Sequence, residues 1–241
     1  MVLATRDLDL LTLVALTRGA TTAQVARLLF PTEDRARRRL RTLFEARLVD
    51  VSLTSSTAPN LITLTRYGKN ALVEARPSLA NRVVVTRPPA PHAARHHVLV
   101  ADLRIYLILL ERQGILQDLV VHSPPADLVS WRPHRLIPDA VAEATIGGET
   151  TVLALEADRG VEAAVVLEEK FERYVEALGR GVADRVVVGV EGGDDEARRV
   201  ARIAQTVGLG EATVVIGRPS LVRGDGAPLR RTTRAHESRT D

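Results

Sequence analysis

Two apolar, alternating runs meet at the Gly147-Gly148 pair, and this pattern constrains the fold more than any other in the chain. Residues 136–146 lead into the pair and residues 150–157 lead out of it. Because glycine readily adopts the positive φ that a two-residue turn requires, the pattern predicts an antiparallel β-hairpin. Centring the turn on the two glycines places Ile146 opposite Glu149 and so sets the register of the whole hairpin.

The same register gathers three carboxylates on one face of the hairpin. Asp139 lies opposite Glu156. Asp158 projects from the same face of the strand as Glu156, because residues two apart on a strand share a face. Opposed like charges destabilise a sheet. A bound Mg²⁺ or Mn²⁺, which prefers carboxylate oxygens, would remove that penalty. The pattern predicts either a metal site formed by Asp139, Glu156 and Asp158, or a hairpin face that is simply hydrated.

These residues also carry a family resemblance. Pro138-Asp139 followed by Glu156-x-Asp158 resembles the motif of the PD-(D/E)xK nuclease superfamily. More narrowly, residues 138–140, residues 155–160 and Lys170-x-x-x-Tyr174 resemble the replication-relaxation family of plasmid and mobile-element proteins. The resemblance extends over roughly residues 5–217 and implies a winged helix joined to a nuclease-like domain.

The resemblance implies that Asp139, Glu156, Asp158 and Lys170 form a metal-dependent catalytic site. The nuclease pattern has a lysine where Asp158 stands, and some members of the superfamily supply that lysine from the following helix, where Lys170 lies. An ordinary surface lysine explains Lys170 equally well. Two functions therefore stay open. One is an Mg²⁺- or Mn²⁺-dependent DNA endonuclease. The other is a non-catalytic accessory protein or transcriptional regulator whose nuclease-like domain binds a relaxase, a replication initiator or RNA polymerase.

The amino-terminal part of the chain has the pattern of a helix-turn-helix followed by a hairpin. Residues 1–90 hold 14 Lys and Arg against 7 Asp and Glu, whereas residues 91–217 hold 13 against 20. The first part is therefore expected to attract DNA phosphates. The elements expected there are helices at 6–17, 23–29 and 33–47, alternating strands at 48–53 and 61–65, and a helix at 66–76.

The third of these helices is rich in arginine. Arg38 and Arg41 are the first candidates for contact with double-stranded DNA, followed by Arg35, Arg37 and Arg39, because helix-turn-helix proteins place this helix in the major groove. A solvated helix face, or a surface for dimerisation or protein contacts, is the alternative.

The proline-dense residues 86–91 predict a joint between two domains. The predicted division is a winged-helix DNA-binding domain at 1–86, a linker at 87–94, a nuclease-like domain at 95–217 and a tail without regular structure at 218–241. In the second domain the pattern predicts, besides the hairpin, helices at 93–113, 162–178 and 194–206 and strands at 118–123, 185–190 and 212–216. This order predicts a mixed sheet flanked by helices, an α+β or α/β fold.

Composition narrows the class of protein further. The chain has no cysteine, which excludes disulfides and thiolate zinc sites. It shows no signal peptide and no apolar run long enough to span a membrane. We expect a soluble, cytoplasmic protein that makes no membrane contact, with a homodimer as one arrangement open to it.

Overall fold

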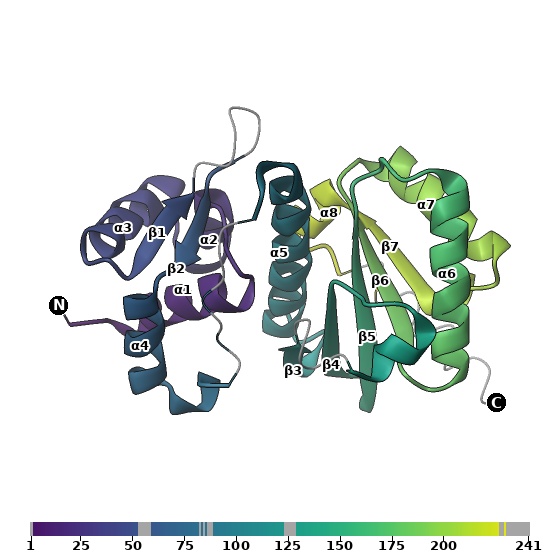
Figure 1. Ribbon diagram of the computed structural model, residues 1–241, viewed down its shortest axis with the longest axis horizontal. Helices are drawn as coiled ribbons and strands as arrows, with labels where there is room; N and C mark the ends of the chain where they lie inside the picture. The colour runs from purple at the N-terminus through teal and green to yellow at the C-terminus, as the bar shows by residue number, and fades with distance from the viewer. Residues whose placement is uncertain are drawn as a thin grey trace. The chain divides into compact units, whose positions relative to one another are not determined.

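In the computed structural model the described residues are 2–52, 59–81, 83, 85, 89–122, 129–226 and 229. They form two compact units, Met1–Ala101 and Asp102–Asp241 (Figure 1). The division falls inside α5 (Pro91–Arg112), which contributes residues to both units. The predicted linker at 87–94 therefore overlaps the start of this helix.

The first unit contains the predicted elements in the predicted order. They are α1 (Thr5–Leu16), α2 (Thr22–Leu29), α3 (Glu33–Glu45), β1 (Val49–Ser52), β2 (Leu61–Leu64), α4 (Arg66–Ala75) and η1 (Pro77–Leu79). β1 and β2 pair antiparallel, with Val49 opposite Leu64. An isolated bridge joins Ala20 to Ile62 and so ties the α1–α2 turn to the hairpin. Residues 53–58, between the two strands and including the end of the predicted strand at 48–53, lie outside the described residues.

Local hydrogen bonds explain where the helices of this unit begin. Thr21 and Gln24 form a capping box, in which Gln24 N–H donates to Thr21 Oγ1 at 3.2 Å and Thr21 N–H donates to Gln24 Oε1 at 2.9 Å. Thr32 Oγ1 accepts from Arg35 N–H at 3.4 Å at the start of α3. These threonines satisfy amide groups that the first turn of a helix leaves unpaired.

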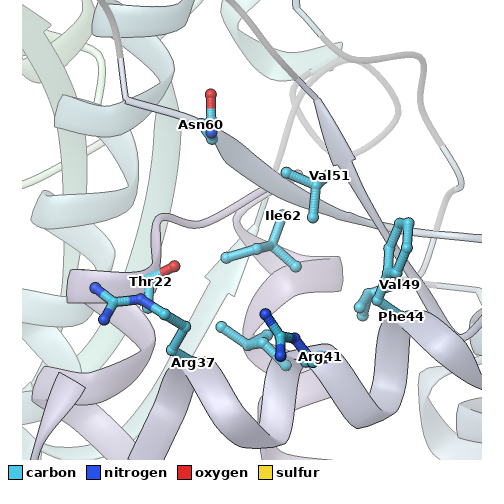
Figure 2. Close-up of a pocket in the computed structure, with 9 residues that line it drawn as sticks. Thr22, Arg37, Arg41, Phe44, Val49, Val51, Asn60 and Ile62 are labelled. Carbon is cyan, nitrogen blue, oxygen red and sulfur yellow. The ribbon is translucent and has the colours of Figure 1, made fainter. Parts of the chain in front are cut away.

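A pocket of about 250 Å³ lies between α3 and the β1–β2 hairpin (Figure 2). Its deepest lining is apolar and comes from Leu40 of α3, Val49 of β1 and Ile62 of β2, all buried. Arg37 and Arg41 of α3 stand at its edge.

The second unit is built on a five-stranded mixed sheet in the order β3-β4-β5-β6-β7. Its strands are β3 (Gln117–His122), β4 (Ala140–Ile146), β5 (Glu149–Asp158), β6 (Arg185–Val190) and β7 (Thr213–Gly217). β3, β4 and β5 pair antiparallel, and β5, β6 and β7 pair parallel. The helical elements besides α5 are η2 (Val129–His134), α6 (Ala164–Gly179), α7 (Asp194–Thr206), η3 (Gly210–Ala212) and α8 (Arg218–Arg223). The predicted mixed α/β fold is confirmed.

The hairpin between β4 and β5 has the predicted register. Gly147 and Gly148 have φ values of 62° and 89°, as a two-residue turn with positive φ at both positions requires. Ile146 lies opposite Glu149. Directly before β4, Asp139 N–H donates to Leu155 O at 3.0 Å, although Leu155 is the register partner of Ala140, so the regular pairing ends at Ala140. Asp139 Oδ2 accepts from Ala157 N–H at 2.9 Å, so this carboxylate lies beside the segment of β5 that carries Glu156.

Helices cover both faces of this sheet (Figure 1). On one face, Leu167 and Phe171 of α6 and Val200 of α7 pack into a core with Ala154 and Val188. On the other face α5 approaches closely, since a Cβ added to Gly189 would lie 2.8 Å from the Leu103 side chain. Because Glu156 and Asp158 share a strand face with Ala154, both carboxylates point to the side of α6 and α7.

The carboxyl-terminal boundary needs a correction. The sequence predicted no regular structure from residue 218 onward, yet Arg218–Arg223 forms α8. This helix is held because Leu221 is fully buried and Arg218 Nε lies 3.0 Å from Asp102 Oδ2. Of the rest of the predicted tail, residues 227, 228 and 230–241 lie outside the described residues. None of the helices in the described ranges has the length and apolarity needed to cross a membrane.

Candidate functional site

Asp139, directly before β4, and Glu156 of β5 lie close together beneath α6. Asp139 Oδ2 accepts a hydrogen bond from Ala157 N–H at 2.9 Å, which fixes the carboxylate beside β5. Glu156 is 3% exposed. Its Oε2 lies 2.7 Å from Lys170 Nζ, and its Oε1 accepts a hydrogen bond from Tyr174 Oη. Lys170 and Tyr174 are four residues apart and so share one face of α6.

Burial and neighbouring charge change the protonation of this group of residues. Burial, together with the charge of Asp139, raises the pKa of Glu156 to about 7, against the opposing effects of Lys170 and Tyr174. Burial lowers the pKa of Lys170, but the charges of Glu156, Glu162 and Asp139 outweigh it, so the net change is upward. At neutral pH Lys170 is therefore a cation beside a carboxyl group that is about half ionised.

Tyr174 and Trp131 complete the surroundings of Glu156. The Trp131 ring lies edge-on to Tyr174, with centroids 5.9 Å apart and an interplanar angle of 69°. Both side chains are buried, and they close the apolar side of the site. Tyr174 entered the sequence prediction as part of the family motif with Lys170, and its hydrogen bond to Glu156 was not predicted. The spacing of Lys170 and Tyr174 was the available signal, whereas nothing in the sequence pointed to Trp131.

Asp158 faces the same side of β5 but is not bonded to the other site residues. Its Oδ1 accepts from Gly160 N–H at 2.8 Å, and its buried Oδ2 makes no hydrogen bond with any residue that the structure describes. The neighbouring Arg159 Nε lies 3.7 Å from Glu191 Oε2. Across the described part of the chain, no three His, Cys, Asp or Glu side chains form a group that could hold a metal ion. The structure thus brings together Asp139, Glu156 and Lys170 and leaves Asp158 apart.

In the first unit, Arg39 is held in an ion pair with Asp7. Arg39 Nε donates to Asp7 Oδ1 at 2.6 Å, and a second guanidinium N–H donates to Oδ2. Burial raises the pKa of Asp7, but hydrogen bonds from Arg39 and from Ala4 N–H lower it by more. Asp7 is 2% exposed. Arg39 therefore joins α3 to α1, an arrangement that the sequence did not predict.

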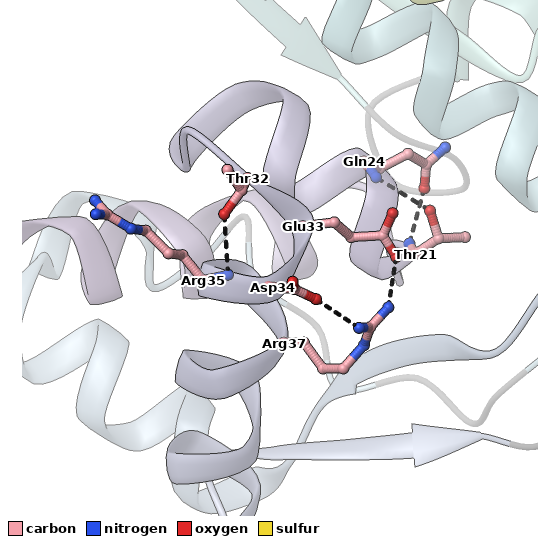
Figure 3. A network of polar contacts seen from close by, with 7 residues as sticks. All are labelled: Thr21, Gln24, Thr32, Glu33, Asp34, Arg35 and Arg37. Carbon is pink, nitrogen blue, oxygen red and sulfur yellow. Dashed lines mark hydrogen bonds and ion pairs between the residues drawn. The ribbon is translucent and has the colours of Figure 1, made fainter.

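The other four arginines of α3 fall into two groups. Arg37 donates to Glu33 Oε1 at 3.0 Å and to Asp34 Oδ1 at 2.9 Å (Figure 3). Arg35, Arg38 and Arg41 have exposed side chains, and none of them forms an ion pair with any residue in the described ranges. Three of the five predicted arginines thus present unneutralised charge on the surface of α3.

A sequence model of the family described as replication-relaxation matches residues 11–189. The chain belongs to the replication-relaxation family. The family predicted from residues 138–140, 155–160 and 170–174 is thereby confirmed. No curated protein and no solved structure shows a significant match to the chain.

The match includes parts of both units of this replication-relaxation protein. It begins within α1 and ends within β6, so it includes all of α3 and the hairpin with Asp139 and Glu156. Lys170 and Tyr174 on α6 also lie inside it. Membership of the family associates the chain with the replication of plasmids and other mobile elements.

Proposed function

We propose that this replication-relaxation protein binds double-stranded DNA through its first unit, a winged helix, and cleaves DNA phosphodiesters at a PD-(D/E)xK-type site in its second unit. The observation that carries the catalytic part is the 2.7 Å contact between Lys170 Nζ and Glu156 Oε2. The strand position that resembles the motif lysine holds Asp158. Lys170 on α6 supplies a cation next to the second motif carboxylate instead.

The roles of these side chains follow from their chemistry. Lys170 stays protonated, so it can stabilise the negative charge that develops on phosphate oxygens during hydrolysis. Tyr174 donates to Glu156 and orients that carboxylate. The Ala157 N–H does the same for Asp139. Asp139 and Glu156 are thus held in place by groups that do not themselves react.

A divalent cation fits the Asp139–Glu156 pair. Burial, and next the charge of Asp139, raise the pKa of Glu156, and a bound cation would relieve the repulsion between the two carboxylates. Mg²⁺ in phosphoryl-transfer sites is commonly held by one or two protein carboxylates, with water and phosphate as further ligands. Asp139 and Glu156 would therefore hold Mg²⁺ or Mn²⁺ without a third protein carboxylate. When bound, the ion would supply a nucleophilic hydroxide and a Lewis acid at the phosphate. Asp158 is a candidate for a second ion, because its Oδ2 makes no hydrogen bond within the described part of the chain.

The DNA-binding part of the proposal is supported by α3. Arg35, Arg38 and Arg41 are exposed and unneutralised within the described ranges, and α3 follows α2 in a helix-turn-helix order. Each arginine that contacts a phosphate should contribute to a decrease of affinity with rising salt.

Incubation of supercoiled plasmid with the protein and Mg²⁺ or Mn²⁺ tests cleavage. We expect nicked or linear product with wild type, and none with Asp139→Ala, Glu156→Ala or Lys170→Ala. Glu169→Ala is the matched control, because Glu169 is an exposed carboxylate on the same helix. Cleavage by all three site variants at the wild-type rate would refute the assignment.

A second candidate function is a non-catalytic accessory protein whose second unit binds a relaxase, a replication initiator or RNA polymerase. The observation in its favour is that Lys170 already neutralises Glu156 and that no three-ligand group exists among the described residues. A plasmid that stays intact but is retarded on a gel would favour this function. Loss of the retardation in Arg38→Ala with Arg41→Ala would then assign DNA contact to α3.

A further inference from the structure

The pocket between α3 and the β1–β2 hairpin has apolar walls that are open to solvent. Phe44 of α3 is 48% exposed and Val51 of β1 is 40% exposed. Beneath them, Leu40 and Ile62 are buried and form the floor. Contact with phosphates does not require apolar surface. The pocket is therefore better suited to a ligand that has an apolar face.

Polar groups surround this apolar lining on several sides. Arg37 and Arg41 come from α3, Thr22 from α2 and Asn60 from the segment that leads into β2 (Figure 2). Arg37 shares its charge with two carboxylates, whereas Arg41 has no ion pair with a described residue. The Asn60 side chain can both donate and accept hydrogen bonds. The pocket therefore offers a cation and an amide next to an aromatic ring.

Helical spacing separates this surface from the rest of α3. Arg37, Arg41 and Phe44 follow one another at intervals of four and three residues and so lie along one side of the helix, toward the hairpin. Arg35 and Arg38 do not line the pocket. The helix thus has one exposed side that is charged only and a second side that combines charge with apolar surface.

We propose that this pocket binds a single unpaired nucleobase of DNA, stacked against Phe44, with Arg41 at the adjoining phosphate and Asn60 at the hydrogen-bonding edge of the base. A volume of about 250 Å³ is smaller than the roughly 300–1,000 Å³ of pockets for drug-sized ligands, and it suits one ring system rather than a peptide helix. Aromatic stacking with arginine at the backbone is how proteins hold unpaired bases. Unpaired bases arise wherever the two strands of a duplex are separated.

This inference rests on the proposed DNA binding and adds a preference for DNA with an extrahelical base. The test compares the affinity of the full-length protein for three DNAs of one sequence. The first is a perfect duplex, the second carries one unpaired thymidine, and the third carries an abasic residue at the same place. The second and third have the same backbone charge, so their difference isolates the base.

We expect wild type to bind the thymidine bulge more tightly than the abasic bulge, by about 5- to 150-fold if the base stacks fully on an aromatic side chain. Phe44→Ala should remove this preference, and Phe44→Trp should restore it. Tyr67→Ala is the control, because Tyr67 is an exposed aromatic residue of the same unit and does not line the pocket. Arg38→Ala should weaken the binding of all three DNAs in similar proportion.

The outcomes that overturn the inference are distinct from those that overturn DNA binding. Wild type that binds all three DNAs equally well would refute the nucleobase pocket and leave the proposed function standing. Wild type that binds none of them would refute both. Without a base preference, an acidic peptide carrying one aromatic residue that binds wild type and not Phe44→Ala would assign the pocket to a protein partner instead.

Discussion

Replacing Glu156 by glutamine should change how the stability of the second unit depends on pH. In the folded protein the pKa of Glu156 is raised from an ordinary 4.5 to about 7, chiefly by burial and next by the charge of Asp139. The folded state therefore holds the proton more tightly than the unfolded chain. The stabilising contribution is complete below about pH 4.5 and is lost as the pH rises through about 7.

The expected magnitude follows from the difference between these two pKa values. At roughly 1.4 kcal/mol per pH unit, the rise from 4.5 to about 7 corresponds to about 3 kcal/mol. Without divalent ions, the wild-type free energy of unfolding should fall by about this amount relative to Glu156→Gln between pH 4.5 and pH 8.

Urea denaturation followed by tryptophan fluorescence measures this difference. Trp131 is the single tryptophan of the chain and lies in the core of the second unit, against Tyr174. Its signal therefore reports on the unit that contains Glu156. Glu169→Gln, an exposed carboxylate on α6, serves as the control and should follow wild type at every pH. A wild-type profile parallel to that of Glu156→Gln across the range would refute the raised pKa and the repulsion inferred from it.

Three further predictions concern other contacts. Asp139→Asn should stabilise the metal-free second unit and abolish the rise in melting temperature that Mn²⁺ causes in wild type. For wild type, the stabilising free energy should be about 2.7 kcal/mol at a metal concentration 100 times Kd. If millimolar Mn²⁺ does not stabilise wild type, the metal site is contradicted. Asp7→Asn should destabilise the first unit by about 2–3 kcal/mol, since Arg39 loses a charged partner. Urea denaturation followed by circular dichroism measures the change. Unchanged stability would show that this ion pair does not stabilise the packing of α3 against α1. Gly68→Ala should destabilise the same unit by about 3 kcal/mol or more, because its Cβ would lie 1.9 Å from Leu48 O. A variant with wild-type stability would show that the backbone of Gly68 does not approach Leu48 O this closely.

The carboxylate pair could be predicted from sequence because its placement depends on neighbours along the chain. The Gly147-Gly148 turn sets which residues of β4 and β5 oppose one another, and strand alternation then sets which face each side chain takes. For the same reason the capped starts of α2 and α3 followed from threonines placed directly before each helix. Alternation alone does not make two carboxylates on one face converge, and Asp158 stays apart from Glu156.

The partners of charged side chains could not be predicted in this way. Arg39 was a candidate for DNA contact on the pattern of α3 alone, but the packing of α1 beside α3 places Asp7 within reach of its guanidinium. The start of the carboxyl-terminal tail was misplaced for a similar reason, since Arg218 meets Asp102 and Leu221 finds a buried position only once the sheet and α5 are assembled.

The sequence by itself determined the order of the main helices and strands as far as β7, the register of the β4–β5 hairpin and the family, because these depend on local hydrogen bonding, on side-chain alternation and on short motifs. Only the tertiary structure decided which group the Lys170 side chain contacts. Its Nζ meets Glu156 because α6 packs over β5 and turns the Lys170–Tyr174 face toward the buried carboxylate. A helix can present such a face in many directions, and the apolar contacts of Leu167 and Phe171 with the sheet select the one that is observed.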